Sequence, residues 1–203
     1  AEDFIALTGP IGAHLHNVSF LNDLPPGASL EGFLFPDTYL FRPGATVSNV
    51  VDKMLANFER KLSLDLRAEI ERQGKSVFDI VTLASLVEQE VVSDRDRRLV
   101  AGILWERLRR GIPLQVDAAV NYITGRRETP LLRELAIDSP YNTYRYAGLP
   151  RGPIANPGLG AIRAAIYPEA SDYLYYLSAP DGRTVFSRTF DEHRQARERY
   201  LRR

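Results

Sequence analysis

The amino-acid sequence predicts an α+β domain that is mainly helical, with a few antiparallel strands and one long irregular loop. Several segments repeat apolar residues at helical spacing behind capping residues, and one segment near the carboxyl end alternates around Asp181-Gly182. The loop is predicted for Pro140–Pro157, which is too rich in proline, glycine and tyrosine for either regular element. With 203 residues, 44% of them hydrophobic, the chain can form one sizeable core.

In the first half of the chain, a strand-like stretch precedes the helices. Aromatic residues run from Phe33 to Phe41 between flanking prolines and glycines, and this pattern predicts a strand. Thr46 can cap the first predicted helix, "VSNVVDKMLANFERKL". Ser76 and Asp79 resemble a capping box that opens a second helix, and Ser93 can cap a third, "DRDRRLVAGILWERLRRG". We therefore expect helices to dominate from residue 47 onward.

The second half begins with the long loop and ends with a small sheet. A loop as long as Pro140–Pro157 in a compact domain is usually functional, although a rigid structural loop with half-packed tyrosines fits the same composition. A short helix is expected over Leu159–Tyr167. The alternation in "DYLYYLSAPDGRTVFSRTF" predicts a β-hairpin that turns at Asp181-Gly182, followed by a polar helix from Asp191 to the carboxyl end.

Composition and motifs disfavour several classes of function. Lys plus Arg equals Asp plus Glu at 26 each, so the net charge provides no field that would attract nucleic acid. The chain has no cysteine for disulfide or thiol chemistry, no stretch of about 20 apolar residues that would span a bilayer, and no glycine motif for phosphate cofactors. His14, His16 and His193 lack further ligands at metal spacing. We expect neither a metal nor an organic cofactor.

Two glutamates stand out in the segment "TLASLVEQEV", which is otherwise apolar nearly all round a helical wheel. Glu88 lies one turn after Ala84, and Glu90 lies one turn after Leu86, so each has apolar neighbours on its own face. Two positions along a helix correspond to about 200°, so the two side chains point nearly opposite ways. They are therefore not expected to act as one pair across a substrate bond.

Two interpretations fit an acid in such a segment. The first is a structural ion pair with one of the arginines. The second is a general acid, because apolar burial raises the pKa of a carboxyl group toward neutrality and lets it donate a proton at physiological pH. The small Ala84 leaves room for a ligand beside Glu88, whereas Glu90 lies beside leucines. We therefore predict Glu88 as the general acid and Glu90 as support for the fold.

Four motifs together resemble a known family. They are "EGFLFPDTY" at residues 31–39, "LASLVEQE" at 83–90, "RLRRGIPLQVDAAVNY" at 107–122 and "SPYNTYRYAGLPRGPIANPG" at 139–158. In this order they resemble the endolytic murein transglycosylases of the MltG (YceG-like) family. The resemblance implies a catalytic domain over residues 31–203, and residues 1–30 would be a linker or the remnant of a preceding LysM-like lobe. It also implies an inner-membrane anchor outside this chain and a location on the extracytoplasmic side of the bacterial envelope.

The resemblance implies roles for individual residues. The family's catalytic glutamate falls on Glu88, and Glu90 matches a second acid of the motif. Cleft positions are also implied, and substrate contact is expected for Gln115, Asp117, Tyr141, Asn142, Thr143 and Tyr144. Two local alternatives stay open, since Asp117 could cap a helix that begins at Ala118 and Asn142 could hold its own loop.

The implied reaction is cleavage of the β-1,4 bond between N-acetylmuramic acid and N-acetylglucosamine without water, which leaves a 1,6-anhydro end. A single glutamate suffices for it, because the muramyl C6 hydroxyl acts as the nucleophile and needs no second acid to hold a water. The implied partners are peptidoglycan strands, with a peptidoglycan synthase as a further candidate. A non-catalytic peptidoglycan-binding module and a water-using muramidase are the alternatives.

Overall fold

The computed structural model describes residues 2–9, 20 and 24–201. Its elements, in chain order, are α1 (Glu2–Thr8), α2 (Val47–Lys61), α3 (Leu64–Arg72), α4 (Val77–Glu90), α5 (Asp94–Arg109), α6 (Asp117–Thr124), the 3-10 helix η3 (Glu134–Ala136), α7 (Leu159–Ile166), β1 (Tyr175–Ser178), β2 (Thr184–Ser187) and α8 (Phe190–Leu201). Helices predominate and the small sheet is antiparallel, which confirms the predicted α+β class. None of the helices in the described part of the chain is long and apolar enough to span a bilayer.

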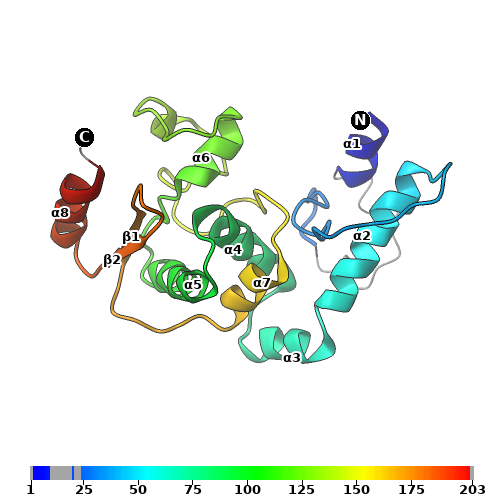
Figure 1. Cartoon of the computed structure of the whole chain (residues 1–203), viewed down its shortest axis with the longest axis horizontal. Helices are drawn as coiled ribbons and strands as arrows, with labels where there is room; N and C mark the ends of the chain where they lie inside the picture. The colour runs from blue at the N-terminus through cyan, green and yellow to red at the C-terminus, as the bar shows by residue number, and fades with distance from the viewer. Residues whose placement is uncertain (1, 10–19, 21–23, 202–203) are drawn as a thin grey trace.

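Helix α4 lies at the centre of the molecule and is buried from Ile80 to Val87. It packs against α5 and α7, with α6 on the side opposite to α7 (Figure 1). The predicted capping box is confirmed, because the Ser76 hydroxyl accepts from the Asp79 amide and the Asp79 carboxylate accepts from the Ser76 amide. The burial of α4 ends after Val87. Glu88 and Glu90, in the last turn, are therefore half-buried and lie near the surface.

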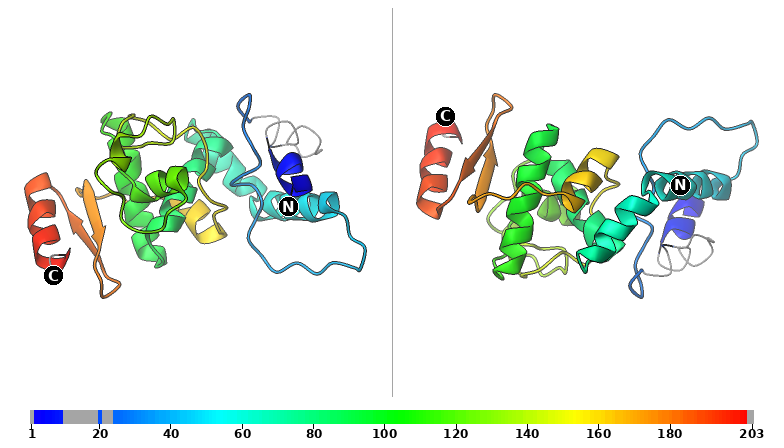
Figure 2. Two further views of the ribbon diagram at one scale, coloured as in Figure 1. Left: turned by 90° about the horizontal axis from the view of Figure 1, so that it is seen from above. Right: turned by 90° about the horizontal axis from the view of Figure 1, so that it is seen from below.

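The two ends of the chain lie at opposite ends of an elongated molecule (Figure 2). Helices α1 and α2 pack together at one end, where the capping box at Thr46 is also confirmed. At the other end α8 packs on the hairpin formed by β1 and β2, which pair in the register Tyr175 to Ser187. The predicted hairpin is thus confirmed. The predicted division of the chain at residue 30 stays a prediction.

The expected strand at Phe33–Phe41 is wrong. Residues 31–33 form a turn, in which the Phe33 amide donates to the Leu30 carbonyl at 3.0 Å, and the residues from Leu34 to Phe41 bend at Leu34 and Asp37 and belong to no strand. Burial is consecutive from Gly32 to Phe35 where a strand with one buried face would alternate. Phe33 packs on Phe58 and Phe78 in the core. Phe33 and Phe35 are therefore part of the hydrophobic core, whereas Phe41 is exposed, and the segment contributes no strand.

The loop Pro140–Pro157 has no regular element, as predicted, and its backbone is tied to the domain at several points. The Ile154 amide donates to the buried Ser85 hydroxyl of α4 at 3.0 Å. The Asn156 carboxamide oxygen accepts from the Gly32 amide at 2.8 Å. Gly32 has φ +91°, and a Cβ there would lie 2.5 Å from the Pro153 ring, so only glycine fits this contact. The loop is thereby fixed across one end of α4.

Candidate active site

The carboxyl end of α4 meets the amino end of α6 at Glu90. The Ala118 amide in the first turn of α6 and the Tyr176 hydroxyl on β1 both donate hydrogen bonds to the Glu90 carboxyl group. The hairpin is also attached here directly, because the Ser178 hydroxyl donates to the Glu90 carbonyl at 3.4 Å. Three elements that are distant in the sequence therefore surround one carboxyl group.

Burial raises the pKa of the Glu90 carboxyl group to about 7, and the negative charge of nearby Asp117 adds to the rise. The hydrogen bonds from Tyr176 and Ala118 act in the opposite direction, since they stabilise the charged form. A carboxylic acid with a pKa near 7 is half protonated at neutral pH. It can therefore give up a proton and take it back within one catalytic cycle.

Glu88 has different surroundings. Its Oε1 lies 3.4 Å from the Arg97 guanidinium on α5, and its Oε2 accepts from the Gly158 amide at 3.4 Å. Arg97 also pairs with Asp94 at 3.2 Å and is packed against Gly160 at the start of α7. This arrangement matches the first interpretation of such an acid, a structural ion pair, and it joins α4, α5 and α7. The assignment of Glu88 as the general acid stays a prediction. Burial and a raised pKa, which favour a general acid, are found at Glu90.

A groove of about 860 Å³ opens at Glu90, and we call it the Glu90 groove. It is lined by residues from the end of α4, from α6 and the segment after it, and from the long loop: Gln89, Glu90, Asp117, Ala118, Asn121, Tyr122, Gly125, Arg126, Arg127, Glu128, Thr129 and Ile154. Its lining is mostly polar, with an acidic end at Glu90 and Asp117 and a basic end at Arg126 and Arg127. Such a lining suits a hydrophilic ligand better than an apolar one.

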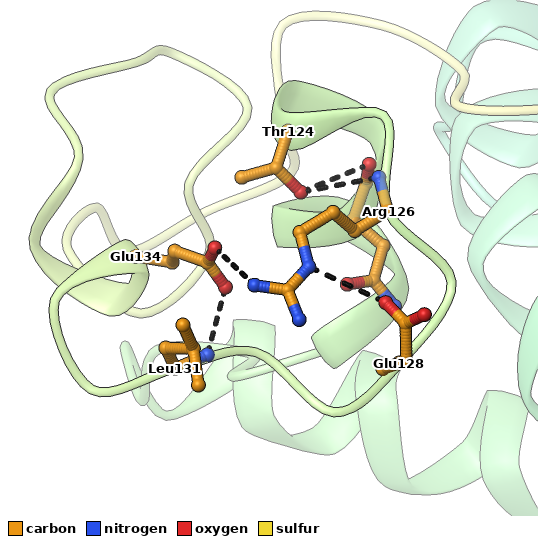
Figure 3. Close-up of polar contacts among 6 residues, drawn as sticks. Thr124, Arg126, Glu128, Leu131 and Glu134 are labelled. Atoms are coloured by element: carbon orange, nitrogen blue, oxygen red, sulfur yellow. Dashed lines mark hydrogen bonds and ion pairs between the residues drawn. The ribbon is translucent and has the colours of Figure 1, made fainter.

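The basic end of the groove is a loop held in shape by one arginine (Figure 3). Arg126 pairs with Glu134 at 2.8 Å and with Glu128 at 3.3 Å, and the second carboxylate oxygen of Glu134 accepts from the Leu131 amide at 2.8 Å. Arg126 is thus occupied by contacts within the loop. Arg127 is exposed, and no ion pair to it occurs among the described residues, so it is the cation of this loop available to a ligand.

Two of the predicted substrate residues, Asp117 and Tyr144, lie together beside Glu90. The Tyr144 hydroxyl donates a hydrogen bond to the Asp117 carboxylate. Burial, and then this bond to Asp117, raises the pKa of the Tyr144 hydroxyl above its usual value. Asp117 is the first residue of α6, and its side chain does not cap the helix. The alternative in which Asp117 caps α6 is therefore not observed, and the Asp117 carboxylate instead lines the Glu90 groove.

Gln115 has a backbone conformation that is rare for its residue type, with φ 54°. Its amide donates to the Thr143 carbonyl at 3.0 Å, and its side-chain oxygen accepts from Arg107 at 2.7 Å. Arg107 is 5% exposed and also donates to the carbonyls of Pro113 and Leu174. Arg107 therefore holds the segment before α6 against the segment before β1, and so positions Asp117 relative to the hairpin.

Asn142 and Thr143 are almost fully buried, each with 1% exposure. The Asn142 amide group donates to the carbonyls of Leu135 and Ile137, and its oxygen accepts from the Tyr144 amide at 3.0 Å. The Thr143 hydroxyl accepts from the Val116 amide at 3.0 Å. Both side chains are satisfied within the protein, so the geometry favours the alternative in which they hold the loop.

Tyr141 does not itself line the Glu90 groove, but its ring lies 4.9 Å, centroid to centroid, from that of Tyr122, which does. The Tyr122 hydroxyl donates to Glu31 at 2.6 Å. Several site residues were not predicted, among them Arg107, Tyr122 and Tyr176. Arg107 sits among several arginines in a helix, and Tyr176 sits in a strand with ordinary alternation, so no local pattern distinguishes them.

The three histidines lie away from the site or outside the described residues. His14 and His16 lie outside the described residues, and His193 lies on α8, where it stacks on Tyr175.

Several known proteins resemble this chain in sequence. It is 38% identical over 174 residues to the endolytic murein transglycosylase of Bacillus subtilis, and the match covers 85% of the chain and 48% of that relative. It is 37% identical over 171 residues to the enzyme of the same name from Streptococcus pneumoniae, covering 81% of the chain and 31% of the relative. The chain therefore spans half or less of the length of these relatives.

A crystal structure of a yceG-like protein from Listeria monocytogenes superposes with a TM-score of 0.81 at 34% identity, covering 96% of this chain and 64% of that one. The model of the YceG-like family matches residues 6–199. The match to the family model extends over nearly the whole sequence and agrees with the four motifs and with the solved fold. The chain belongs to the YceG-like family.

Proposed function

We propose that this chain is the catalytic part of an endolytic murein transglycosylase, and that Glu90 is its general acid and base. The activity is supported by the similarity to relatives that are named endolytic murein transglycosylases. The observation that carries the assignment of the acid is the environment of Glu90. Its carboxyl group has a pKa of about 7 and lies in an open groove beside Asp117, whereas Glu88 is paired with Arg97.

The proposed reaction breaks the bond between muramyl C1 and the O4 of the next sugar. Protonated Glu90 gives its proton to O4 as that bond breaks, and the muramyl C6 hydroxyl attacks C1 to form the 1,6-anhydro ring. The resulting Glu90 carboxylate takes the proton from the attacking hydroxyl and is restored for the next cycle. No water and no second acid take part, and the nucleophile is held in place by the sugar ring itself.

Asp117 and Tyr176 have supporting roles in this scheme. The negative charge of Asp117 favours the protonated form of Glu90 before the reaction and stabilises the positive charge that develops at C1 during it. The Tyr176 hydroxyl bonds to Glu90 and stabilises its carboxylate after the proton has left. Tyr144 fixes the carboxylate of Asp117 through its own hydrogen bond.

A water-using muramidase is the second candidate, because Asp117 places another carboxylate in the Glu90 groove. Such enzymes use two acids, one of which activates a water or attacks the sugar. Analysis of the ends of digested glycan strands separates the two. Anhydro ends identify a transglycosylase and free reducing ends identify a hydrolase, whereas uncut strands that stay bound identify a non-catalytic module.

Peptidoglycan lies outside the cytoplasmic membrane, so the proposed activity assigns the chain to the extracytoplasmic part of the bacterial envelope. The anchor that the resemblance implies would lie in a part of the protein other than this chain. A synthase that makes glycan strands is the class of partner that fits, since an enzyme that cuts within strands acts where strands are extended.

A further inference from the structure

A second space lies next to the Glu90 groove, on the far side of a tyrosine pair, and we call it the distal hollow. Its volume is about 290 Å³, and it is lined by residues 25–29, Phe78, Tyr141 and residues 151–153. Tyr122 lines the Glu90 groove, and Tyr141, whose ring contacts that of Tyr122 at a tilt of 43°, lines the distal hollow. Along the long loop, Ile154 lines the groove and its neighbour Pro153 lines the hollow. The two spaces therefore adjoin each other along a shared wall.

The walls of the distal hollow are held in place. Pro25 and Pro26 form one side and Pro153 the other, and proline limits backbone motion. On the shared wall, the Tyr122 hydroxyl is fixed by its bond to Glu31. Gly152 also lines the distal hollow and is closely surrounded, because a Cβ there would lie 3.4 Å from the Phe78 ring and 3.5 Å from the Tyr141 hydroxyl. A ligand that enters this space would meet a largely preformed surface, so little ordering would oppose its binding.

The chemistry of the distal hollow combines an aromatic ring with a cation. Tyr141 contributes a ring of the kind that packs on sugar faces. Arg151 is exposed, and its guanidinium has no hydrogen bond or ion pair within the described part of the chain. A muramyl sugar carries a carboxyl group on its lactyl ether, either free or linked to a stem peptide that has carboxylates of its own. An arginine is the side chain best suited to such a group.

We propose that the distal hollow binds a further muramyl unit of the strand being cut, with Arg151 paired to the carboxylate carried by that unit. The inference rests on the proposed function and extends it, because it says where the strand continues beyond the bond at Glu90. An enzyme that cuts inside a strand needs contacts with sugars away from the cleaved bond. The distal hollow supplies such contacts beyond the pair formed by Tyr122 and Tyr141, as seen from the Glu90 groove.

The test compares strands of two lengths. A strand of four sugars spans the bond at Glu90, whereas a strand of eight also reaches the distal hollow. Arg151→Gln is expected to lower kcat/KM for the longer strand by about three- to fivefold, the size of one exposed ion pair, and less at high salt. The shorter strand should be cut at the wild-type rate. Arg163→Gln, which changes an exposed arginine on α7 that lines neither space, is the matched control and should alter neither value.

A second variant tests the space itself. Ala28→Trp fills the distal hollow from its rim and should reduce the preference for the longer strand at least tenfold, with the melting temperature as the check on folding. Strands stripped of peptides and strands that keep them distinguish the source of the carboxylate. A loss confined to stripped strands indicates the lactyl group, and a loss confined to peptide-bearing strands indicates the stem; either result supports the proposal.

Two results would overturn the proposal. One is a ratio of long-strand to short-strand kcat/KM that stays at the wild-type value in both Arg151→Gln and Ala28→Trp. The other is an equal loss on both lengths together with a lowered melting temperature, which indicates a structural role. If the wild-type chain cuts no strand, the proposed function fails. The affinity of the Glu90→Gln protein for eight-sugar strands, measured with and without Arg151→Gln, then still decides whether the distal hollow binds them.

Discussion

Replacing Glu90 by Gln should inactivate the enzyme and stabilise the protein at alkaline pH. In the folded state the pKa of Glu90 is about 7, against the ordinary value of 4.5 for a glutamate in the unfolded chain. A rise of this size corresponds to about 3 kcal/mol. Because the folded pKa is raised, this contribution to stability is fully present below pH 4.5 and is lost as the pH rises through 7. The substituted glutamine does not titrate, so the variant avoids the loss.

The measurement is thermal unfolding of both proteins at pH 4 and at pH 8.5. At pH 4 wild type and Glu90→Gln should melt at nearly the same temperature, since protonated glutamate and glutamine have the same shape. At pH 8.5 the variant should melt about 6 to 12 °C higher, because 1 kcal/mol shifts the midpoint by about 2 to 4 °C in a domain of this size. Activity should fall at least about 10²-fold at every pH, which is the usual cost of losing a general acid.

The assignment of Glu90 as a buried general acid is refuted by either of two results. One is a Glu90→Gln protein that cuts strands at near the wild-type rate. The other is a difference in melting temperature between the two proteins that is the same at both values of pH. The first result would return the role of the acid to Glu88. The second would mean that Glu90 does not lie in the buried, negatively charged setting described for it. Wild-type kcat/KM should itself fall as the pH rises through about 7, because the proton donor is then lost.

Three further changes test the rest of the site. Glu88→Gln should break the pair with Arg97 and cost roughly 1 kcal/mol of stability while activity stays within a few-fold of wild type; loss of turnover with unchanged stability would contradict this. Tyr176→Phe removes a donor that lowers the pKa of Glu90, so the alkaline limb of the pH–activity profile should move upward, and an unmoved limb would count against this contact. Asn142→Ala should lower stability by about 2 to 4 kcal/mol, measured in urea, while glycan affinity of the folded fraction stays unchanged; weaker affinity would restore it as a contact residue.

The helices could be predicted because their signals are local. A capping box at Ser76 and Asp79 and a cap at Ser93 are short-range hydrogen bonds that depend on residue type and spacing alone. The hairpin around Asp181-Gly182 is equally local. The strand predicted at Phe33–Phe41 was wrong because a run of aromatic residues fits either a strand or an irregular segment that packs in the hydrophobic core. Its contacts with Phe58 and Phe78, far along the chain, decide between the two.

The site was predicted less well than the fold. A helical wheel shows that Glu88 and Glu90 face opposite ways, but it does not show what lies on each side. The arginine beside Glu88 comes from α5, and the Asp117 beside Glu90 comes from α6. Burial of Asn142 likewise depends on carbonyls of η3 and the residue after it. Roles that depend on contacts between distant segments become visible only when those segments are placed in space.

The hairpin contributes more than a small sheet, because its attachment to Glu90 joins residues 88 positions apart in the sequence. Tyr176, the partner of the acid, lies on β1, which pairs with β2, and both strands pack on α8. A molecule in which the hairpin has not yet folded holds Glu90 without its hydroxyl partner. Under the proposed function, the hydrogen-bonded surroundings of the acid are thus complete only once the hairpin has folded against the rest of the domain.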